Sequence, residues 1–101
     1  MVRRAVDNST LDRWRELDSL LVLRFVAEYL KQDTDYNPRA SLGTTRWHAN
    51  VGGRDYEILC TGAKFHDTRA KHGSGGAVDL VMHLLRLDFK QAVAVLKKSG
   101  L

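Results

Sequence analysis

The sequence predicts an α+β fold with a long N-terminal helix, a three-stranded antiparallel meander and two C-terminal helices. Two changes of period carry this prediction. Apolar residues recur at three- and four-residue steps over the first third of the chain and alternate with polar residues from Thr44 onward. The helical period returns after Gly76. At 101 residues and 44% hydrophobic content, the chain fits one globular domain.

The long helix is expected from Leu11 to about Lys31. Its apolar stripe is broad, which suggests contact with more than one neighbour. A polar loop that contains the only proline, Pro38, ends it. Residues 1–10 are expected to be a flexible N-terminus, so that residues 11–101 form the domain. The core of the stripe is Trp14, Leu17, Leu21, Phe25 and Tyr29.

The middle of the chain predicts three strands, over residues 44–51, 54–61 and 64–67. Apolar and polar residues alternate in the first two, as in a sheet with one buried face. Gly52-Gly53 suits a tight hairpin turn because glycine tolerates positive φ. The two C-terminal helices are expected over residues 77–87 and 89–98, with Asp88 capping the second and Gly100 ending it.

Composition favours an anionic partner. The chain has sixteen Lys and Arg residues and twelve Asp and Glu residues, which gives a net charge of +4. Positively charged proteins attract anionic partners, of which nucleic acid is the commonest. The single cysteine, Cys60, cannot form an internal disulfide and indicates a reduced thiol in a cytoplasmic protein. No segment reaches the 18 or so apolar residues that a membrane helix needs, and no secretory signal begins the chain, so no membrane association is expected.

The second half of the chain resembles a known family. The segments that carry the resemblance are the aromatic strand 64–67, the glycine run 73–76, the apolar helix start 77–82 and the Phe-x-x-Ala helix within 87–96. They are similar to the N-terminal zinc-binding domain of bacterial DnaG-type primases and to related domains of phage and plasmid primase proteins. The resemblance covers about residues 45–98 and implies a zinc-ribbon-like module of a replication protein.

The sequence departs from this family at the metal site. The family holds zinc with a Cys-x-x-His pair and a Cys-x-x-Cys pair, and the second pair would fall near Arg69 and His72. Because arginine cannot ligate zinc, the resemblance implies a metal-free variant, as in proteins joined to TOPRIM domains or relaxases of mobile elements. No cofactor is therefore expected. A rearranged zinc site is the less favoured alternative and would use Cys60, His48, His66 and His72.

The basic loop from Arg69 to Gly76 is the best candidate site. Backbone N–H groups at a helix start, opened by glycines, can hold a phosphate beside cationic side chains. The alternative is that Gly75 and Gly76 only allow a tight turn and close packing of helix on sheet. Sheet cations interleaved with Trp47, Tyr56 and Phe65 could also follow a single strand, although Trp47 and Phe65 are better explained as core. The predicted nucleic-acid-binding residues are Arg46, Arg54, Lys64, Arg69, Lys71, His72, Gly75 and Gly76.

These observations predict a DNA-binding module of a primase-like or mobile-element replication protein, without catalytic activity of its own. Its DNA is expected to be single-stranded and to be captured through phosphates. No arrangement of nucleophile and base suggests an enzyme. The alternative is a protein-interaction module that docks onto a primase, helicase or relaxase through the apolar first helix.

Overall fold

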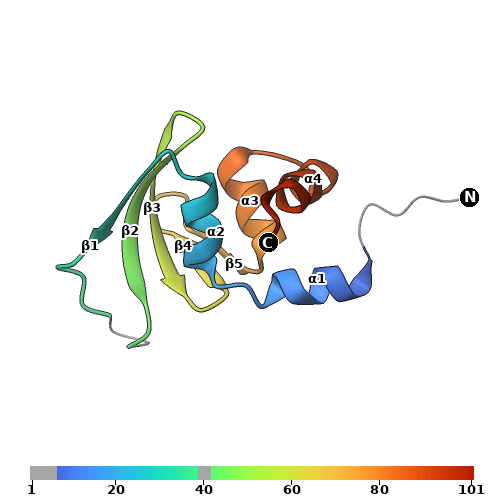
Figure 1. Ribbon diagram of the computed structural model, residues 1–101. Helices are drawn as coiled ribbons and strands as arrows, with labels where there is room; N and C mark the ends of the chain where they lie inside the picture. The colour runs from blue at the N-terminus through green and yellow to red at the C-terminus, as the bar shows by residue number, and fades with distance from the viewer. Residues whose placement is uncertain (1–6, 39–41) are drawn as a thin grey trace, which may run out of the picture.

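The computed structural model describes residues 7–38 and 42–101, in which the chain forms four helices and one five-stranded antiparallel sheet (Figure 1). No helix in these ranges is long and apolar enough to cross a membrane. Of the predicted flexible N-terminus, residues 1–6 lie outside the described ranges. The elements are α1 (Asn8–Arg15), α2 (Ser19–Val26), β1 (Tyr29–Asp33), β2 (Thr45–Val51), β3 (Arg54–Thr61), β4 (Lys64–Asp67), β5 (His72–Gly75), α3 (Ala77–Leu85) and α4 (Phe89–Ser99).

The predicted long N-terminal helix is wrong, because residues 11–31 contain two short helices and a strand. The first break follows α1, where the side chain of Asp18 caps α2 by accepting a hydrogen bond from the Leu20 N–H. Ser19 donates to the carbonyl of Gly62 from both its N–H (2.7 Å) and its hydroxyl (2.8 Å). These contacts with the β3–β4 turn fix the break, and a sequence period cannot reveal them.

The second break follows α2, where the chain enters the sheet. The Glu28 N–H donates to the Asn50 carbonyl (2.8 Å), and Tyr29 then pairs with Asn50 as β1 joins the edge of β2. Tyr29 belongs to the predicted helical stripe, yet as consecutive strand residues Tyr29 and Leu30 face opposite sides of the sheet. Short apolar runs fit both the helical and the strand period, and here the pairing of β1 with β2 makes this segment a strand.

The predicted three-stranded meander is also wrong, because the sheet has five strands in the order β1-β2-β3-β4-β5. Its three central strands occupy the predicted ranges to within one residue. The two strands that were not predicted, β1 and β5, are the edge strands of the sheet. β5 has the sequence His-Gly-Ser-Gly, which has little intrinsic strand preference, and it forms because Phe65 and Ser74 pair across the β4–β5 hairpin.

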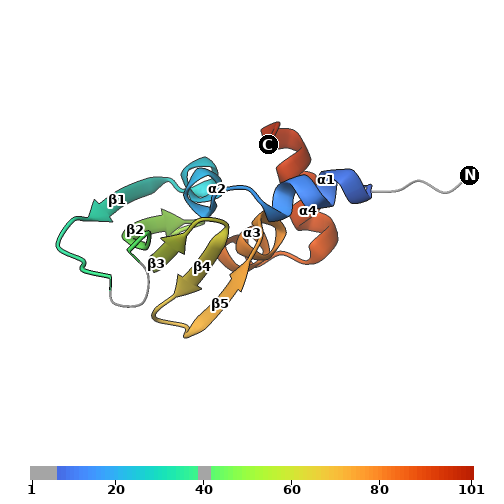
Figure 2. The ribbon, with the colours of Figure 1, turned by 90° about the horizontal axis from the view of Figure 1, so that it is seen from below.

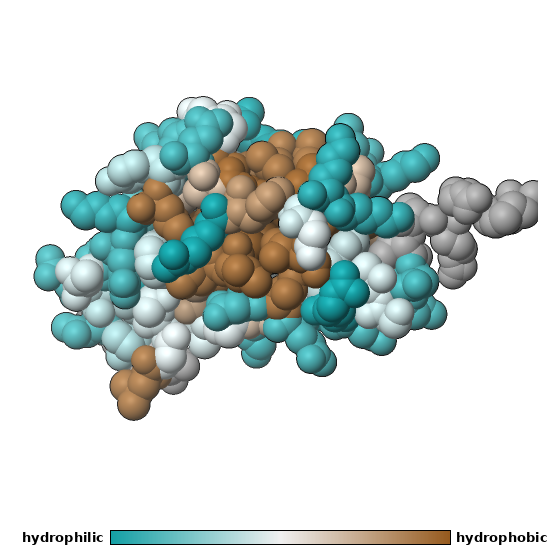
Figure 3. All heavy atoms as spheres, in the orientation of Figure 1, coloured by the Kyte–Doolittle hydropathy of each residue, from teal (hydrophilic) through white to brown (hydrophobic). Residues whose placement is uncertain are grey.

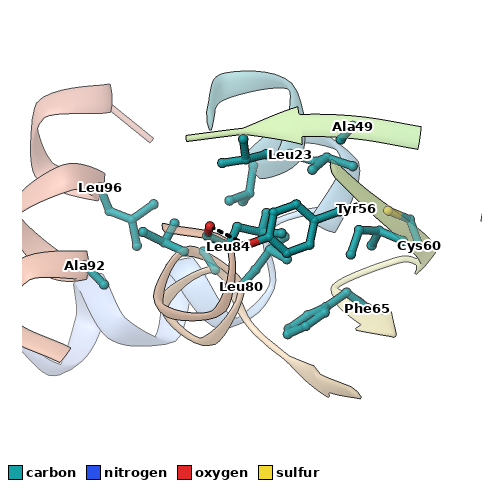
Figure 4. Close-up of a cluster of buried hydrophobic side chains, with 14 of the residues drawn as sticks. Leu23, Ala49, Tyr56, Cys60, Phe65, Leu80, Leu84, Ala92 and Leu96 are labelled. Atoms are coloured by element: carbon teal, nitrogen blue, oxygen red, sulfur yellow. Dashed lines mark hydrogen bonds between the residues drawn. The ribbon is translucent and has the colours of Figure 1, made fainter. Parts of the chain in front are cut away.

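The helices lie on one side of the sheet and bury its inner face (Figures 1 and 2). Burial alternates along β2 and β3, so that every second side chain enters the core. Trp47 and Phe65 are buried, which confirms their interpretation as core residues. Figure 4 shows the inner face meeting the helices, with Tyr56 from the sheet beside Leu80 and Leu84 of α3 and Cys60 farther from α3.

The C-terminal helices start where the sequence predicts. Asp88 and Gln91 form a capping box at the start of α4, and Gly100 ends that helix in a left-handed conformation. α3 ends at Leu85, two residues earlier than predicted, because Arg86 takes φ 57° and the Leu87 N–H turns back to the Met82 carbonyl (3.1 Å). This ending turns Arg86 out of the helix.

Candidate nucleic-acid interface

The predicted phosphate site, a basic loop beside a helix start, is not formed. Residues 69–76 are not one loop, because β5 lies within them. Arg69 and Lys71 occupy the turn before β5, whereas Gly76 precedes α3 after it. A four-residue strand spans about 13 Å. The basic side chains and the start of α3 therefore lie at opposite ends of β5.

The backbone conformation accounts for Gly76. Its φ is 101°, it is buried, and its N–H already donates to the Ala63 carbonyl (3.0 Å). A Cβ there would make only ordinary contact, 3.7 Å from Cα of Arg15 on α1, so the positive φ rather than a lack of space requires glycine. Asp79 supplies a carboxylate to the first turn of α3, where it complements the helix dipole and would repel a phosphate. The tight-turn alternative fits this position better than an anion site.

Arg46 is held in ion pairs on the outer face of the sheet. It donates to the Asp33 carboxylate from two nitrogens, at 2.6 and 2.9 Å, and lies 3.8 Å from the carboxylate of Glu57. Its guanidinium also lies over the Tyr36 ring, 4.9 Å from the centroid. The Arg46 hydrogen bond holds the pKa of Asp33 below its usual value. Its charge is therefore already neutralised within the protein, and Arg46 does not belong to a free anion-binding surface.

Lys64 and Gly75 face each other across the β4–β5 pair, near the start of α3. They lie at the far end of the hairpin from Arg69 and Lys71. The other predicted nucleic-acid-binding residues therefore fall into two groups. Arg54, Arg69, Lys71 and His72 lie toward one end of the sheet, whereas Lys64, Gly75 and Gly76 lie toward the other.

Two contacts assemble the first of these groups. The Thr68 N–H donates to the Glu57 carbonyl (3.1 Å), which places the β4–β5 turn beside the beginning of β3. The Tyr56 hydroxyl donates to the Leu84 carbonyl (2.9 Å), which places the end of α3 over the same part of the sheet (Figure 4). Arg86 follows Leu84 by two residues and thus joins this end.

We call this group of four exposed cations the basic end. Among the residues that the structure describes, none of the four forms an ion pair. The nearby carboxylates have other partners: Asp55 accepts from the Asn50 side chain (3.0 Å), and Asp67 is buried. The basic end comprises Arg54, Arg69, Lys71 and Arg86.

A buried carboxylate organises the turn of the basic end. Asp67 is 3% exposed, and its Oδ1 accepts from the N–H groups of Arg69 (3.0 Å) and Ala70 (3.1 Å). Its Oδ2 lies 2.6 Å from Nε2 of His83 on α3. Burial alone would raise the pKa of Asp67, but these hydrogen bonds outweigh it and hold the pKa below its usual value.

Sequence reasoning missed Asp67, His83 and Arg86. One signal was present, since alternation along β4 puts Asp67 on the buried face with Phe65. A carboxylate at a buried strand position needs a partner, although the sequence does not say which. The early end of α3, which exposes Arg86, depends on a left-handed residue that no local pattern predicts.

The residues of the alternative zinc site are not brought together. Cys60 lies on the buried face of β3, whereas His48 and His66 are on the opposite face of the sheet. Across residues 7–38 and 42–101, no group of three or more His, Cys, Asp or Glu side chains is placed to hold a metal ion.

Cys60 is expected to react slowly with thiol reagents in the folded protein. Burial raises the pKa of its thiol, and the charge of Asp18 adds to this, against a smaller opposing hydrogen bond from Ser19. Because the thiolate is the reactive form, labelling at pH 8 should be at least about tenfold slower than in urea-unfolded protein. Immediate stoichiometric labelling of the native protein would show that Cys60 is accessible.

No protein-family model, curated protein or solved structure matches this chain.

Proposed function

We propose that this protein binds nucleic acid by capturing phosphates at the basic end. The observation that carries the proposal is that four exposed cations, in two turns and at a helix end, lie toward the same end of the sheet without a carboxylate partner among the described residues. Lys and Arg bind phosphates by charge and hydrogen bonding and release counterions, which makes such binding sensitive to salt.

The proposal narrows the predicted interface. Arg54, Arg69, Lys71 and His72 remain in it, and Arg86 is added. Arg46 is left out because it is held in ion pairs, and Gly76 because its backbone conformation accounts for it. Lys64 and Gly75 are left out because they lie at the far end of β5 from the other cations. Membership in a primase-like or mobile-element replication protein, a cytoplasmic location and the lack of catalytic activity stay predictions from the sequence.

Removing charge from the basic end is expected to weaken binding at least about tenfold. The variant is Arg54→Gln, Arg69→Gln and Lys71→Asn, where asparagine suits the left-handed backbone of Lys71 (φ 55°). Each lost phosphate contact should also lower the slope of log affinity against log salt by about 0.7–0.9. Fluorescence anisotropy with single-stranded and duplex oligonucleotides, at several salt concentrations, measures both effects.

The matched control removes three exposed lysines of α4 instead, by Lys90→Gln, Lys97→Gln and Lys98→Gln. Both triple variants have a net charge of +1, which is three below the parent's +4. Binding that survives in the control assigns the effect to position rather than to total charge. Equal losses in both variants, or a parent protein that binds no oligonucleotide, would contradict the proposal.

Docking of a protein partner, such as a primase, helicase or relaxase, is the second candidate. Of the predicted apolar stripe only Trp14 is fully buried, whereas Leu21 (44% exposed) and Phe25 (48% exposed) lie one turn apart on the outside of α2. Figure 3 shows apolar surface gathered on the face where α2 lies. Sedimentation distinguishes the candidates, because self-association or partner binding without oligonucleotide retention favours docking.

A further inference from the structure

A pair of stacked imidazoles adjoins the basic end. The His72 ring lies on the His83 ring, with centroids 4.7 Å apart and planes inclined by 22°. Phe65 lies behind both, 6.0 Å from His72 and 5.9 Å from His83. His72 is itself exposed, so its ring is supported by His83 while part of the residue remains open to solvent.

The support under His72 is held in place by the same carboxylate that shapes the cationic turn. Asp67 positions His83 through one oxygen and the backbone of Arg69 and Ala70 through the other. Tyr56 meets the His83 ring edge-on, with centroids 6.0 Å apart. The position of the open ring relative to the adjoining cations is therefore set before any ligand arrives, which lowers the entropy cost of binding.

A hollow of about 320 Å³ opens beside these rings, between β5 and α3. This volume is near the lower end of the roughly 300–1,000 Å³ usual for small-ligand sites. Lys71 and Arg86 each precede a lining residue directly in sequence, although neither lines the hollow itself. The lining side chains are His72, Ser74, Asp79, Met82, His83 and Leu87.

The charges of the hollow favour a nucleobase over a phosphate inside it. Asp79 contributes a carboxylate, which accepts a hydrogen bond from the Ser74 hydroxyl (2.6 Å) and repels anions. The same carboxylate can accept hydrogen bonds from the N–H groups at the edge of a base. The cations of the turn lie outside, where the sugar–phosphate backbone would pass.

We propose that an unpaired nucleobase stacks on His72 and enters this hollow while Lys71, which directly precedes His72, holds an adjacent phosphate. The inference rests on the function proposed above and specifies its ligand as a single strand. A base within a duplex is already stacked on both faces and paired along one edge, so it cannot present a face to His72 without being extruded. Aromatic side chains stack with any base, so the site is expected to tolerate different sequences.

The test is His72→Ala, compared with the parent protein for a single-stranded oligonucleotide and for the duplex of the same sequence. We expect affinity for the single strand to fall about tenfold, while duplex affinity and the salt dependence stay unchanged. His72→Phe should restore single-strand binding because it keeps a flat ring. His66→Ala is the matched control, since that histidine is also exposed but lies on the opposite face of the sheet. Thermal melts establish that each variant is folded.

The possible outcomes separate the two proposals. Unchanged single-strand affinity in His72→Ala, with loss of binding in the charge variant, overturns the stacking site and leaves phosphate capture standing. Equal losses for single strand and duplex, or failure of His72→Phe to restore binding, also overturn stacking. A parent protein that binds neither oligonucleotide overturns both proposals.

Discussion

Replacing Trp14 by alanine is expected to lower the free energy of unfolding by about 3–5 kcal/mol, as for other fully buried aromatic residues. Trp14 is the only buried residue of α1, with 1% of its surface exposed, and it belongs to the same core as the sheet and α3. Its truncation would remove the fully buried apolar contact of α1 and leave only partly buried Leu11 on the core. Urea unfolding followed by circular dichroism measures the change.

Trp14→Phe is the informative comparison. The indole Nε1 of Trp14 is buried and has no hydrogen-bond partner among the described residues, so the larger ring carries a desolvation penalty. Phenylalanine keeps most of the apolar volume and removes that N–H. We expect this variant to stay within about 1.5 kcal/mol of the parent. A loss below about 1 kcal/mol in Trp14→Ala would show that α1 does not pack stably on the core.

Asp67→Ala is expected to lower stability by about 3 kcal/mol at pH 7, because it leaves His83 and two backbone N–H groups without their acceptor. The effect should depend on pH. The pKa of Asp67 is lower in the folded state than its ordinary value of 3.8, so its stabilising contribution is complete above that value. The contribution is lost as the pH falls through the folded-state pKa.

Unfolding measured at pH 7 and near pH 3 checks this prediction, since the difference between parent and Asp67→Ala should shrink in acid. Asp55→Ala is the matched control, because Asp55 is exposed and bonds only to the Asn50 side chain. Its stability should change by less than about 0.5 kcal/mol. A constant difference between parent and Asp67→Ala across the pH range would argue against an ionised Asp67 as the cause.

Features that depend on local chemistry were predictable from the sequence. The β2–β3 hairpin follows from alternation interrupted by Gly52-Gly53, and α4 follows from a capping residue, an apolar stripe and a terminal glycine. In each case the signal and the structure lie within a few residues of one another. Local propensity and tertiary packing agree there, so nothing distant overrides the pattern.

Features that depend on distant partners were not predictable. The break at Ser19 needs the carbonyl of Gly62, and β5 needs the edge of β4, because its own residues have no strand preference. The candidate site also depends on residues that are distant in sequence. Its cations were recognised by residue type, but the ion pairs of Arg46 and the insertion of a strand between Lys71 and Gly76 decided which of them act together.

The double hydrogen bond from Ser19 to Gly62 has a consequence for how this protein can be dissected. It ties the N-terminal third of the chain to a turn in the middle of the sheet, and Val22 and Leu23 enter the core immediately after it. Truncation past this point would uncover the core rather than release an independent piece. Deletions past this point would therefore abolish folding whether or not they remove ligand contacts. Point substitutions are the suitable way to locate those contacts.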